Sequence, residues 1–402
     1  MLKLAPELKQ DATLPKITKV AVTQFRYSVK NAARDDTTGK LYYCIGAQAE
    51  MPSFAIRVHA GDHTGEYVAH MGGRPPVLAQ VLSVAKLAVG QPLAAGASFT
   101  NRSNKHLQTF GGLGTGAIDI ALWDLLAKSL DTSVSNLIGK FRSKLPAYAS
   151  LIHGNAQGDL TDGEGLRDAI ASCLSVGLTG IKFRGRPGSA AHDYVNAIEV
   201  AASTVPSDAV RLFLDPGCDL ERFSDALFVG RAADAARLFW LEDLIRDSGK
   251  SLAAHRRLRG RIQTPLLCGE HIRGLEAKAE WVSGDATDFI RADPELDGGI
   301  TGCLKIAHLA EAFGMDVELH GSGPAHRVAM AAIRNTNFYE LGLALPDGTN
   351  VHAPTVYADG YSDDFSALDS NSCVTVPNGP GLGVTYDWDR ISAGTKEVFE
   401  FS

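Results

Sequence analysis

The sequence predicts an α/β protein, in which a (β/α)8-type TIM barrel follows an N-terminal α+β domain. From about residue 145 onward, short apolar runs alternate with amphipathic segments, as in repeated strand-helix units. Three of these runs end in an acidic residue at nearly constant spacing, with 27 residues from Asp215 to Glu242 and 28 from Glu242 to Glu270. This interval is about one strand-helix repeat of a barrel of roughly 250 residues.

Residues 1–140 are predicted to form the N-terminal α+β domain, which caps the barrel. The segments 17–25 and 53–60 alternate apolar and polar residues, which is typical of antiparallel strands with one face in water. Helix-like stretches follow them. An antiparallel sheet with helices on one side is therefore expected here.

Residues 141–345 are predicted to form the barrel itself, and a closed barrel is the simplest arrangement of its strands. Helices are expected between them, for example at 190–203, 274–282 and 306–313. Residues 346–402 are rich in Pro, Gly, Asp and Ser and then turn apolar and aromatic, so we expect them to pack back on the capping domain. The eight predicted strands are 146–151, 180–184, 211–215, 236–242, 265–270, 287–293, 315–320 and 338–341.

Composition narrows the class of protein. Lys and Arg total 39 against 46 Asp and Glu, a net charge of −7, which argues against a nucleic-acid-binding surface. The sequence has no apolar run long enough for a membrane span and no signal-peptide pattern at its start, so a cytoplasmic location is expected. The six cysteines form no C-x-x-C pair, so they predict neither a zinc site nor a disulfide framework.

The three spaced acids predict a metal site. Asp215, Glu242 and Glu270 would converge at the barrel mouth, because the carboxyl ends of parallel strands meet there. Three carboxylates repel one another unless a cation holds them, and oxygen ligands without Cys or His suit Mg²⁺. A single acid at such a position is more often a helix cap, but three in register favour a metal site.

Two further strand ends predict a proton-transfer dyad. Asp293 ends the sixth strand and His320 the seventh, 27 residues later. Side by side at the rim, the carboxylate would fix the imidazole tautomer and raise its basicity. Either residue alone would more often be structural; their position at strand ends favours catalysis.

The second and eighth strands add charged candidates. Lys182 and Arg184 lie two residues apart, so they share one face of the second strand and both point into the barrel if one does. Cations there can clamp a carboxylate. Arg184 is a poor base because guanidinium stays protonated, whereas Lys182 needs a lowered pKa to act as one. Glu340 ends the eighth strand and can hydrogen-bond a substrate oxygen.

With these motifs in place, the chain resembles the enolase superfamily, specifically its mandelate racemase and muconate lactonizing enzyme type, over nearly its whole length. Residues 116–125 match the family's signature helix before the barrel, and residues 293–301 match the segment that supplies the dyad aspartate. The resemblance favours the mandelate racemase subgroup. It assigns Asp215, Glu242 and Glu270 as Mg²⁺ ligands, His320 and Asp293 as the dyad, Glu340 as the strand-eight acid, and Lys182 and Arg184 as the Lys-x-Lys site.

The resemblance also implies a half-reaction, in which Mg²⁺ binds a substrate carboxylate, a base removes the α-proton and the metal stabilises an enediolate. Three departures qualify it. Arg184 stands in place of the usual second Lys. Asp215 is followed by Pro216 and Gly217 where many members have Asp-x-Asn, and no proline follows the acid pair Glu242 and Asp243.

Three functions remain open at this level. Because His320 is the one unambiguous base, the first is a Mg²⁺-dependent hydro-lyase that dehydrates an acid sugar or related hydroxy acid. The second is a racemase or epimerase of a hydroxy acid or amino-acid derivative, with Lys182 and His320 on opposite faces of the α-carbon. The third is a catalytically weak carboxylate-binding protein, which retention of the dyad and Glu340 makes least favoured.

The substrate itself is not predicted by the sequence. Two polar loops of the capping domain are expected to cover the barrel mouth, residues 27–40 with Asn31, Arg34, Asp35 and Asp36, and residues 66–75 with His70 and Met71. As partners we expect a small-molecule carboxylate substrate and further copies of this chain in a homo-oligomer, with neither nucleic acid nor membrane.

Overall fold

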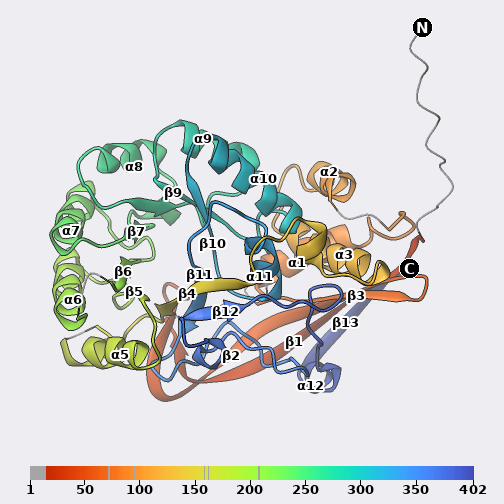
Figure 1. The fold of residues 1–402 in the computed structure, drawn as a ribbon, viewed down its shortest axis with the longest axis horizontal. Helices are drawn as coiled ribbons and strands as arrows, with labels where there is room; N and C mark the ends of the chain where they lie inside the picture. Colours follow the sequence, from red (N-terminus) through yellow and green to blue (C-terminus); the bar gives the residue numbers. More distant parts are fainter. Residues whose placement is uncertain (1–14, 71–72, 94–95, 158, 162, 207–208) are drawn as a thin grey trace, which may run out of the picture.

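The computed structural model describes residues 15–70, 73–93, 96–157, 159–161, 163–206 and 209–402. A capping domain lies beside a barrel whose strands are surrounded by helices (Figure 1). Among the described residues, no helix is both long and apolar enough to cross a membrane.

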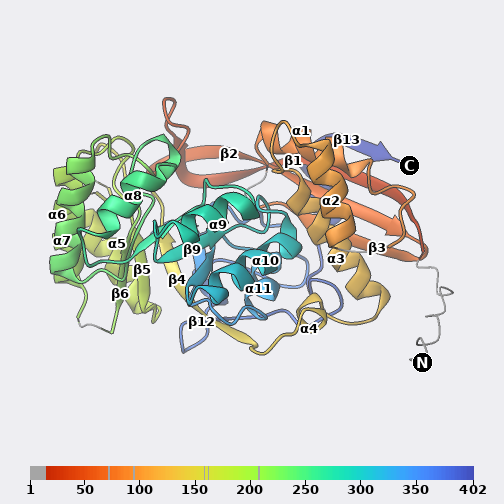
Figure 2. The same cartoon turned by 90° about the horizontal axis from the view of Figure 1, so that it is seen from above.

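The capping domain is an antiparallel sheet covered by helices. Its sheet has the order β13-β1-β2-β3, and the helix α3 packs on β3 so closely that a Cβ on Gly65 would lie 2.3 Å from the carbonyl oxygen of Ala121. The long β1–β2 hairpin reaches from this domain towards the barrel (Figure 2). The elements are β1 (Ile17–Arg34), β2 (Leu41–Ala60), β3 (His63–Val68), α1 (Pro75–Ala85), α2 (Ala97–His106), α3 (Thr115–Ser129) and α4 (Val134–Leu137).

The barrel contains eight parallel strands in the order β10-β9-β8-β7-β6-β5-β4-β11, with a helix between successive strands. The predicted TIM-barrel fold is confirmed. The strands are β4 (Lys144–Leu151), β5 (Gly180–Phe183), β6 (Arg211–Leu214), β7 (Trp240–Glu242), β8 (Leu266–Cys268), β9 (Phe289–Ala292), β10 (Asp316–Leu319) and β11 (Tyr339–Ala344). The helices are α5 (Gly163–Ser175), α6 (Ala191–Thr204), α7 (Phe223–Ala236), α8 (Leu252–Arg259), α9 (Leu275–Ser283), α10 (Gly299–Ala312) and α11 (Pro324–Met330).

The C-terminal segment returns to both parts of the molecule. The strand β12 (Cys373–Thr375) pairs with β4, and β13 (Thr395–Phe401), after the helix α12 (Trp388–Ala393), pairs with β1. Short 3-10 turns lie at Asp247–Gly249 and Phe365–Ala367. The Trp388 indole donates to Glu66 at 2.7 Å and the Arg57 guanidinium lies 4.0 Å from its ring. Because β13 pairs with β1, the last strand completes the capping sheet.

The helix α3 joins the capping domain to the barrel. Gly116 allows its backbone to approach the loop after β9, where a Cβ would lie 2.3 Å from the Glu295 carbonyl oxygen. The Asp119 carboxylate accepts from both the Thr301 backbone N–H, at 3.1 Å, and its hydroxyl, at 2.8 Å, near the start of α10. This explains why the segment 116–125 is so distinctive in sequence.

The barrel closes between β10 and β11 through a buried carboxylate. Glu318 accepts from the backbone N–H groups of Asn337, at 3.0 Å, and Phe338, at 3.2 Å, while the Val317 N–H donates to the Asn335 carbonyl at 2.8 Å. A side chain thus provides hydrogen bonds that a strand ladder supplies elsewhere in the sheet. Burial raises the pKa of Glu318 to about 7, against the hydrogen bonds that lower it.

This pKa predicts how stability changes with pH. The folded state holds the Glu318 proton more tightly than the unfolded state, so protonated Glu318 adds to the free energy of unfolding. This added stability is fully present below pH 4.5 and is lost as the pH rises through about 7. The loss is on the order of 3 kcal/mol. Denaturant unfolding across this range should show a steeper decline in the free energy of unfolding for the parent than for Glu318→Gln, whereas a substitution of the exposed Glu276, Glu276→Gln, should follow the parent. Parallel curves for the parent and Glu318→Gln would contradict this.

Candidate active site

Alternation along the barrel strands builds two layers of inward-facing side chains. The lower layer is aromatic, with Tyr148, Phe213 and Trp240 fully buried and the rings of Phe213 and Trp240 stacked at 4.0 Å. Two residues further along each strand, the side chains are polar or charged, as period-two geometry requires. The aromatic layer excludes water from below, so charges in the upper layer interact strongly.

The upper layer contains a ring of buried ion pairs. The Lys182 ammonium lies 2.8 Å from both Glu242 Oε2 and Glu340 Oε1. Arg291 binds the other oxygens, at 2.7 Å to Glu242 Oε1 and 3.3 Å to Glu340 Oε2, and donates to the Tyr148 hydroxyl at 2.9 Å. Burial lowers the pKa of Lys182, but Glu242 and Glu340 outweigh it and the pKa is raised.

Arg184 continues this charged layer towards the rim. Its guanidinium donates to Asp215 Oδ2 at 2.7 Å, to the Ser150 hydroxyl at 2.8 Å and to the Leu151 carbonyl at 2.6 Å. Lys182 lies 3.5 Å from the same Asp215 oxygen. Burial raises the pKa of Asp215, but the charges of Arg184 and Lys182 lower it by more, so the pKa is below its usual value.

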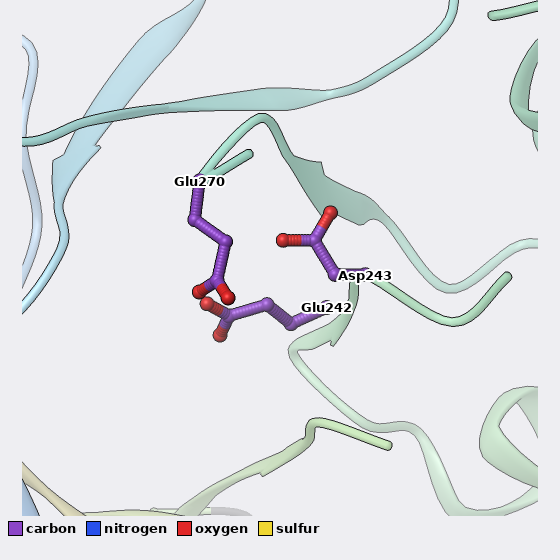
Figure 3. Close-up of side chains that lie close together, drawn as sticks. All are labelled: Glu242, Asp243 and Glu270. Atoms are coloured by element: carbon purple, nitrogen blue, oxygen red, sulfur yellow. The ribbon is translucent and has the colours of Figure 1, made fainter. Parts of the chain in front are cut away.

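A cluster of three carboxylates lies at the ends of β7 and β8 (Figure 3). One oxygen each of Glu242, Asp243 and Glu270 lies within 4.8 Å of the others. The carboxylates of Glu242 and Glu270 point towards one another. Asp243 Oδ2 is buried and has no hydrogen-bond partner among the described residues. Burial and then Glu270 raise the pKa of Asp243 well above its usual range.

The sequence-predicted ligands are thus only partly grouped. Glu242 and Glu270 lie together, but the third member of their cluster is Asp243, whereas Asp215 is paired with Arg184. Asp243 has a positive φ of 37°, which alters the side-chain direction that simple strand alternation gives. Asp215 is still nearby, because Lys182 contacts both it and Glu242.

His320 and Asp293 form a hydrogen-bonded pair. His320 Nδ1 lies 3.0 Å from Asp293 Oδ2, and His320 Nε2 lies 3.2 Å from Glu270 Oε2. Burial lowers the pKa of His320, but Glu270 and Asp293 raise it by more. Burial raises the pKa of Asp293, but the hydrogen bond with His320 and its charge lower it by more, and the resulting pKa is about 2. The imidazole therefore connects the dyad to the carboxylate cluster.

A second set of contacts holds this dyad from behind. Asp293 Oδ1 accepts from the backbone N–H of Glu295 at 2.8 Å, and the Asp293 N–H donates to Asp297 at 3.0 Å. Lys278, fully buried on α9, lies 3.2 Å from Asp297 and donates to the carbonyls of Gly269, at 2.8 Å, and Arg291, at 2.6 Å. These contacts fix the strand ends that present Glu270 and Asp293.

Both segments that we predicted as loops contact the barrel rim, although residues 27–34 belong to β1 and residues 66–68 to β3 rather than to loops. Lys40 donates to the Gly217 carbonyl at 2.7 Å and pairs with Asp219, just after Asp215. In the other loop, Glu295 accepts from the His70 backbone N–H at 2.6 Å. Met71, which we also predicted for this loop, lies outside the described residues.

Several residues of the site were not predicted from the sequence. Arg291 lies two residues before Asp293, so the alternation that placed Lys182 beside Arg184 would have pointed Arg291 inward as well. The others, Asp243, Lys278 and Glu295, lie beyond strands or on a helix, where period-two alternation gives no signal.

Comparison with known families identifies the class of protein. Residues 165–390 match the enolase C-terminal domain-like family, and residues 56–139 match the N-terminal domain of mandelate racemase and muconate lactonizing enzymes. The chain therefore belongs to the enolase superfamily and is of the mandelate racemase and muconate lactonizing enzyme type.

Individual relatives include several dehydratases. The chain is 27% identical over 280 residues to D-gluconate dehydratase of Thermoproteus tenax, a match over 67% of this chain and 53% of that protein. It is 27% identical to L-talarate/galactarate dehydratase of Salmonella typhimurium strain LT2, over 60% of this chain and 56% of the relative. Both matches thus span little more than half of the relative's length.

A solved structure matches more completely. D-glucarate dehydratase from Agrobacterium tumefaciens, complexed with magnesium, has a TM-score of 0.80 and 26% identity, over 95% of this chain and 99% of that one. The barrel and the capping domain are therefore shared with an enzyme whose structure contains the metal.

The ligand prediction can be tested one acid at a time. We expect Asp215→Asn, Glu242→Gln and Glu270→Gln to weaken Mg²⁺ binding at least tenfold, because each removes a charged oxygen ligand. Asp243→Asn should weaken it less, because Asp243 is not one of the three predicted ligands. Titration calorimetry with Mg²⁺ measures each affinity, and circular dichroism checks the fold. A larger loss in Asp243→Asn than in Asp215→Asn would replace Asp215 by Asp243 in the ligand set.

Proposed function

We propose that this protein is a Mg²⁺-dependent hydro-lyase that dehydrates an acid sugar or a related hydroxy acid to a 2-keto acid. Protons would be transferred by the His320–Asp293 dyad, which is the dyad of the mandelate racemase subgroup. The observation on which this proposal rests is that His320, which is held by Asp293, lies at the carboxylate cluster, while Lys182 is enclosed by carboxylates.

Lys182 is poorly placed to act as a second base. Its side chain is fully buried, and its ammonium is directed at Glu242, Glu340 and Asp215. Releasing a proton there would remove one of the positive charges that these buried carboxylates share. Arg184 is no better, because guanidinium remains protonated. A racemase needs a base on each face of the α-carbon, so these contacts favour the dehydratase over the racemase or epimerase.

A dehydratase needs only one base. His320 Nε2 would take the α-proton, while Asp293 holds the imidazole through Nδ1 and stabilises its cationic form. The protonated imidazole would then give this proton to the departing β-hydroxyl. The α C–H and β C–O bonds break, water leaves, and the enol product tautomerises to the 2-keto acid. Arg184 would bind a substrate oxygen at the rim.

The residues present fit Mg²⁺. Their donor atoms are carboxylate oxygens, and the buried Asp243 Oδ2 lacks a partner among the described residues, as an oxygen beside a cation site would. Glu242 and Glu270, with Asp215, would hold the ion. When bound, Mg²⁺ would supply positive charge that stabilises the anion formed on the substrate carboxylate.

Proton exchange in D₂O tests the proposed function. With Mg²⁺ and a library of acid sugars, we expect a 2-keto acid to form without return of deuterium to both α-epimers. His320→Asn should abolish α-proton exchange, and Asp293→Asn should slow turnover and move the acidic limb of the pH profile to lower pH, because losing the carboxylate lowers the pKa of His320. Interconversion of two epimers at the rate of turnover would establish the racemase instead, and undiminished exchange by His320→Asn would exclude the dyad.

Arg184 offers a separate test of the single-base arrangement. Arg184→Lys places an amine that can release its proton where guanidinium cannot, so deuterium should begin to appear in both α-epimers. Arg184→Ala should mainly raise KM, because it removes a substrate contact. Product analysis by NMR measures both effects. A large loss of kcat with unchanged KM in Arg184→Ala would assign this residue to the chemical step.

A further inference from the structure

The tip of the β1–β2 hairpin is fastened to the mouth of the barrel at two places. This hairpin tip, residues 35–43, belongs to the hairpin that reaches from the capping domain towards the barrel (Figure 2). At the end of β4, the Tyr43 backbone N–H donates to the His153 carbonyl at 2.8 Å. At the end of β6, the Lys40 ammonium donates to the Gly217 carbonyl at 2.7 Å. The hairpin tip therefore connects two strand ends of the barrel.

The contact with Gly217 lies in the turn that follows the predicted metal ligand Asp215. The Gly217 backbone N–H donates to Asp215 Oδ1 at 2.8 Å. The next peptide unit accepts from Lys40 through the Gly217 carbonyl and donates through the Cys218 N–H to the Asp243 carbonyl at 2.7 Å. Lys40 thus holds one side of a peptide unit whose other side is bound to the end of β7.

The backbone of this turn depends on its contacts. Gly217 and Cys218 both have a positive φ, of 63° and 65°. This conformation is unfavourable for Cys218, because its Cβ crowds the backbone, and it persists where surrounding contacts impose it. The turn directs the Gly217 N–H back onto the Asp215 carboxylate. Contacts that hold the turn therefore also hold that carboxylate.

The glycine at position 217 makes room for Lys40. A Cβ on Gly217 would lie 2.9 Å from Lys40 Nζ and 3.4 Å from its Cε atom. A side chain at this position would therefore displace the ammonium group from the turn. The departure from Asp-x-Asn at Pro216 and Gly217 is thus matched by a lysine that the capping domain supplies.

The charge of Lys40 and its position have opposite effects on a bound cation. The ammonium and Mg²⁺ repel one another, so if charge alone mattered, removing the ammonium would strengthen Mg²⁺ binding. If Lys40 instead holds the turn after Asp215, removing it would weaken Mg²⁺ binding. Asp219 balances the ammonium charge, and the two side chains are only 21% and 12% exposed. This pairing reduces the repulsion and leaves the positional effect as the larger one.

We propose that Lys40 is a positioning residue for the predicted ligand Asp215, so that docking of the hairpin tip on the barrel and binding of Mg²⁺ favour one another. Lys40 holds the turn at Gly217, and the turn holds the carboxylate. Because such coupling is reciprocal, bound Mg²⁺ would in turn keep the hairpin tip on the barrel. This inference rests on the proposed function only through the assignment of Asp215 as a Mg²⁺ ligand, and it requires no turnover.

Titration calorimetry of the full chain with Mg²⁺ tests the direction of the effect. Lys40→Met should weaken Mg²⁺ binding about 5- to 50-fold, a range typical of coupling between two sites. Lys40→Arg, which can still donate to the Gly217 carbonyl, should retain most of the affinity. Lys30→Met removes the same charge from an exposed position of β1 and should bind Mg²⁺ as the parent does. Tighter or unchanged binding by Lys40→Met would overturn the positioning role.

Hydrogen exchange measured by mass spectrometry gives a readout that needs no variant of Lys40. At Mg²⁺ concentrations that saturate each protein, the ion should slow exchange in the hairpin tip of the parent but not in that of Asp215→Asn. The turn between β2 and β3, residues 60–63, should exchange alike with and without the ion. Exchange in the parent's hairpin tip that Mg²⁺ leaves unchanged would overturn the coupling, as would slowing that persists in Asp215→Asn.

These outcomes are separable from those that test the proposed function. If Lys40→Met loses Mg²⁺ affinity but the parent dehydrates no acid sugar, the positioning role stands and the proposed function fails. If the parent dehydrates an acid sugar and its Mg²⁺ affinity does not depend on Lys40, the proposed function stands and the positioning role fails.

Discussion

The active site depends on Glu242 being held between two buried cations. Lys182 binds one of its oxygens and Arg291 the other, and both cations also bind Glu340. These four side chains come from β5, β7, β9 and β11, so the ion pairs connect strands across the barrel. Removing one partner of such a buried pair costs about 3–5 kcal/mol, because it leaves an uncompensated charge. The positions of the acids are therefore set by their counter-charges as well as by the backbone.

The aromatic layer below makes these ion pairs strong. Tyr148 contributes to both layers, since its ring packs edge-on to Trp240 at 5.7 Å and its hydroxyl accepts from Arg291. Gly180 keeps β5 close to this layer, because a Cβ there would lie 2.7 Å from the Tyr148 Cβ. Water is thus excluded from the floor, where it would otherwise weaken the attraction between Lys182 and its carboxylates.

Sequence reasoning succeeded where one regular period determines the structure. The strand-helix spacing predicted all eight barrel strands, and strand alternation placed Lys182 and Arg184 on one inward face. It could not predict Asp243, whose positive φ breaks the strand period. Nor could it predict that Glu318 bonds the backbone of residues 337 and 338, because that contact depends on how β10 and β11 meet in three dimensions.

The enclosure of Lys182 has a stereochemical consequence for the proposed reaction. Asp293 holds His320 at one side of the carboxylate cluster, and Lys182 is occupied by its carboxylates at the floor. If one imidazole both removes the α-proton and protonates the β-hydroxyl, these two groups must leave from the same face of the substrate. A sugar acid with the opposite configuration at either carbon would present only one of them to His320. The single base would therefore select among diastereomers at the reacting carbons.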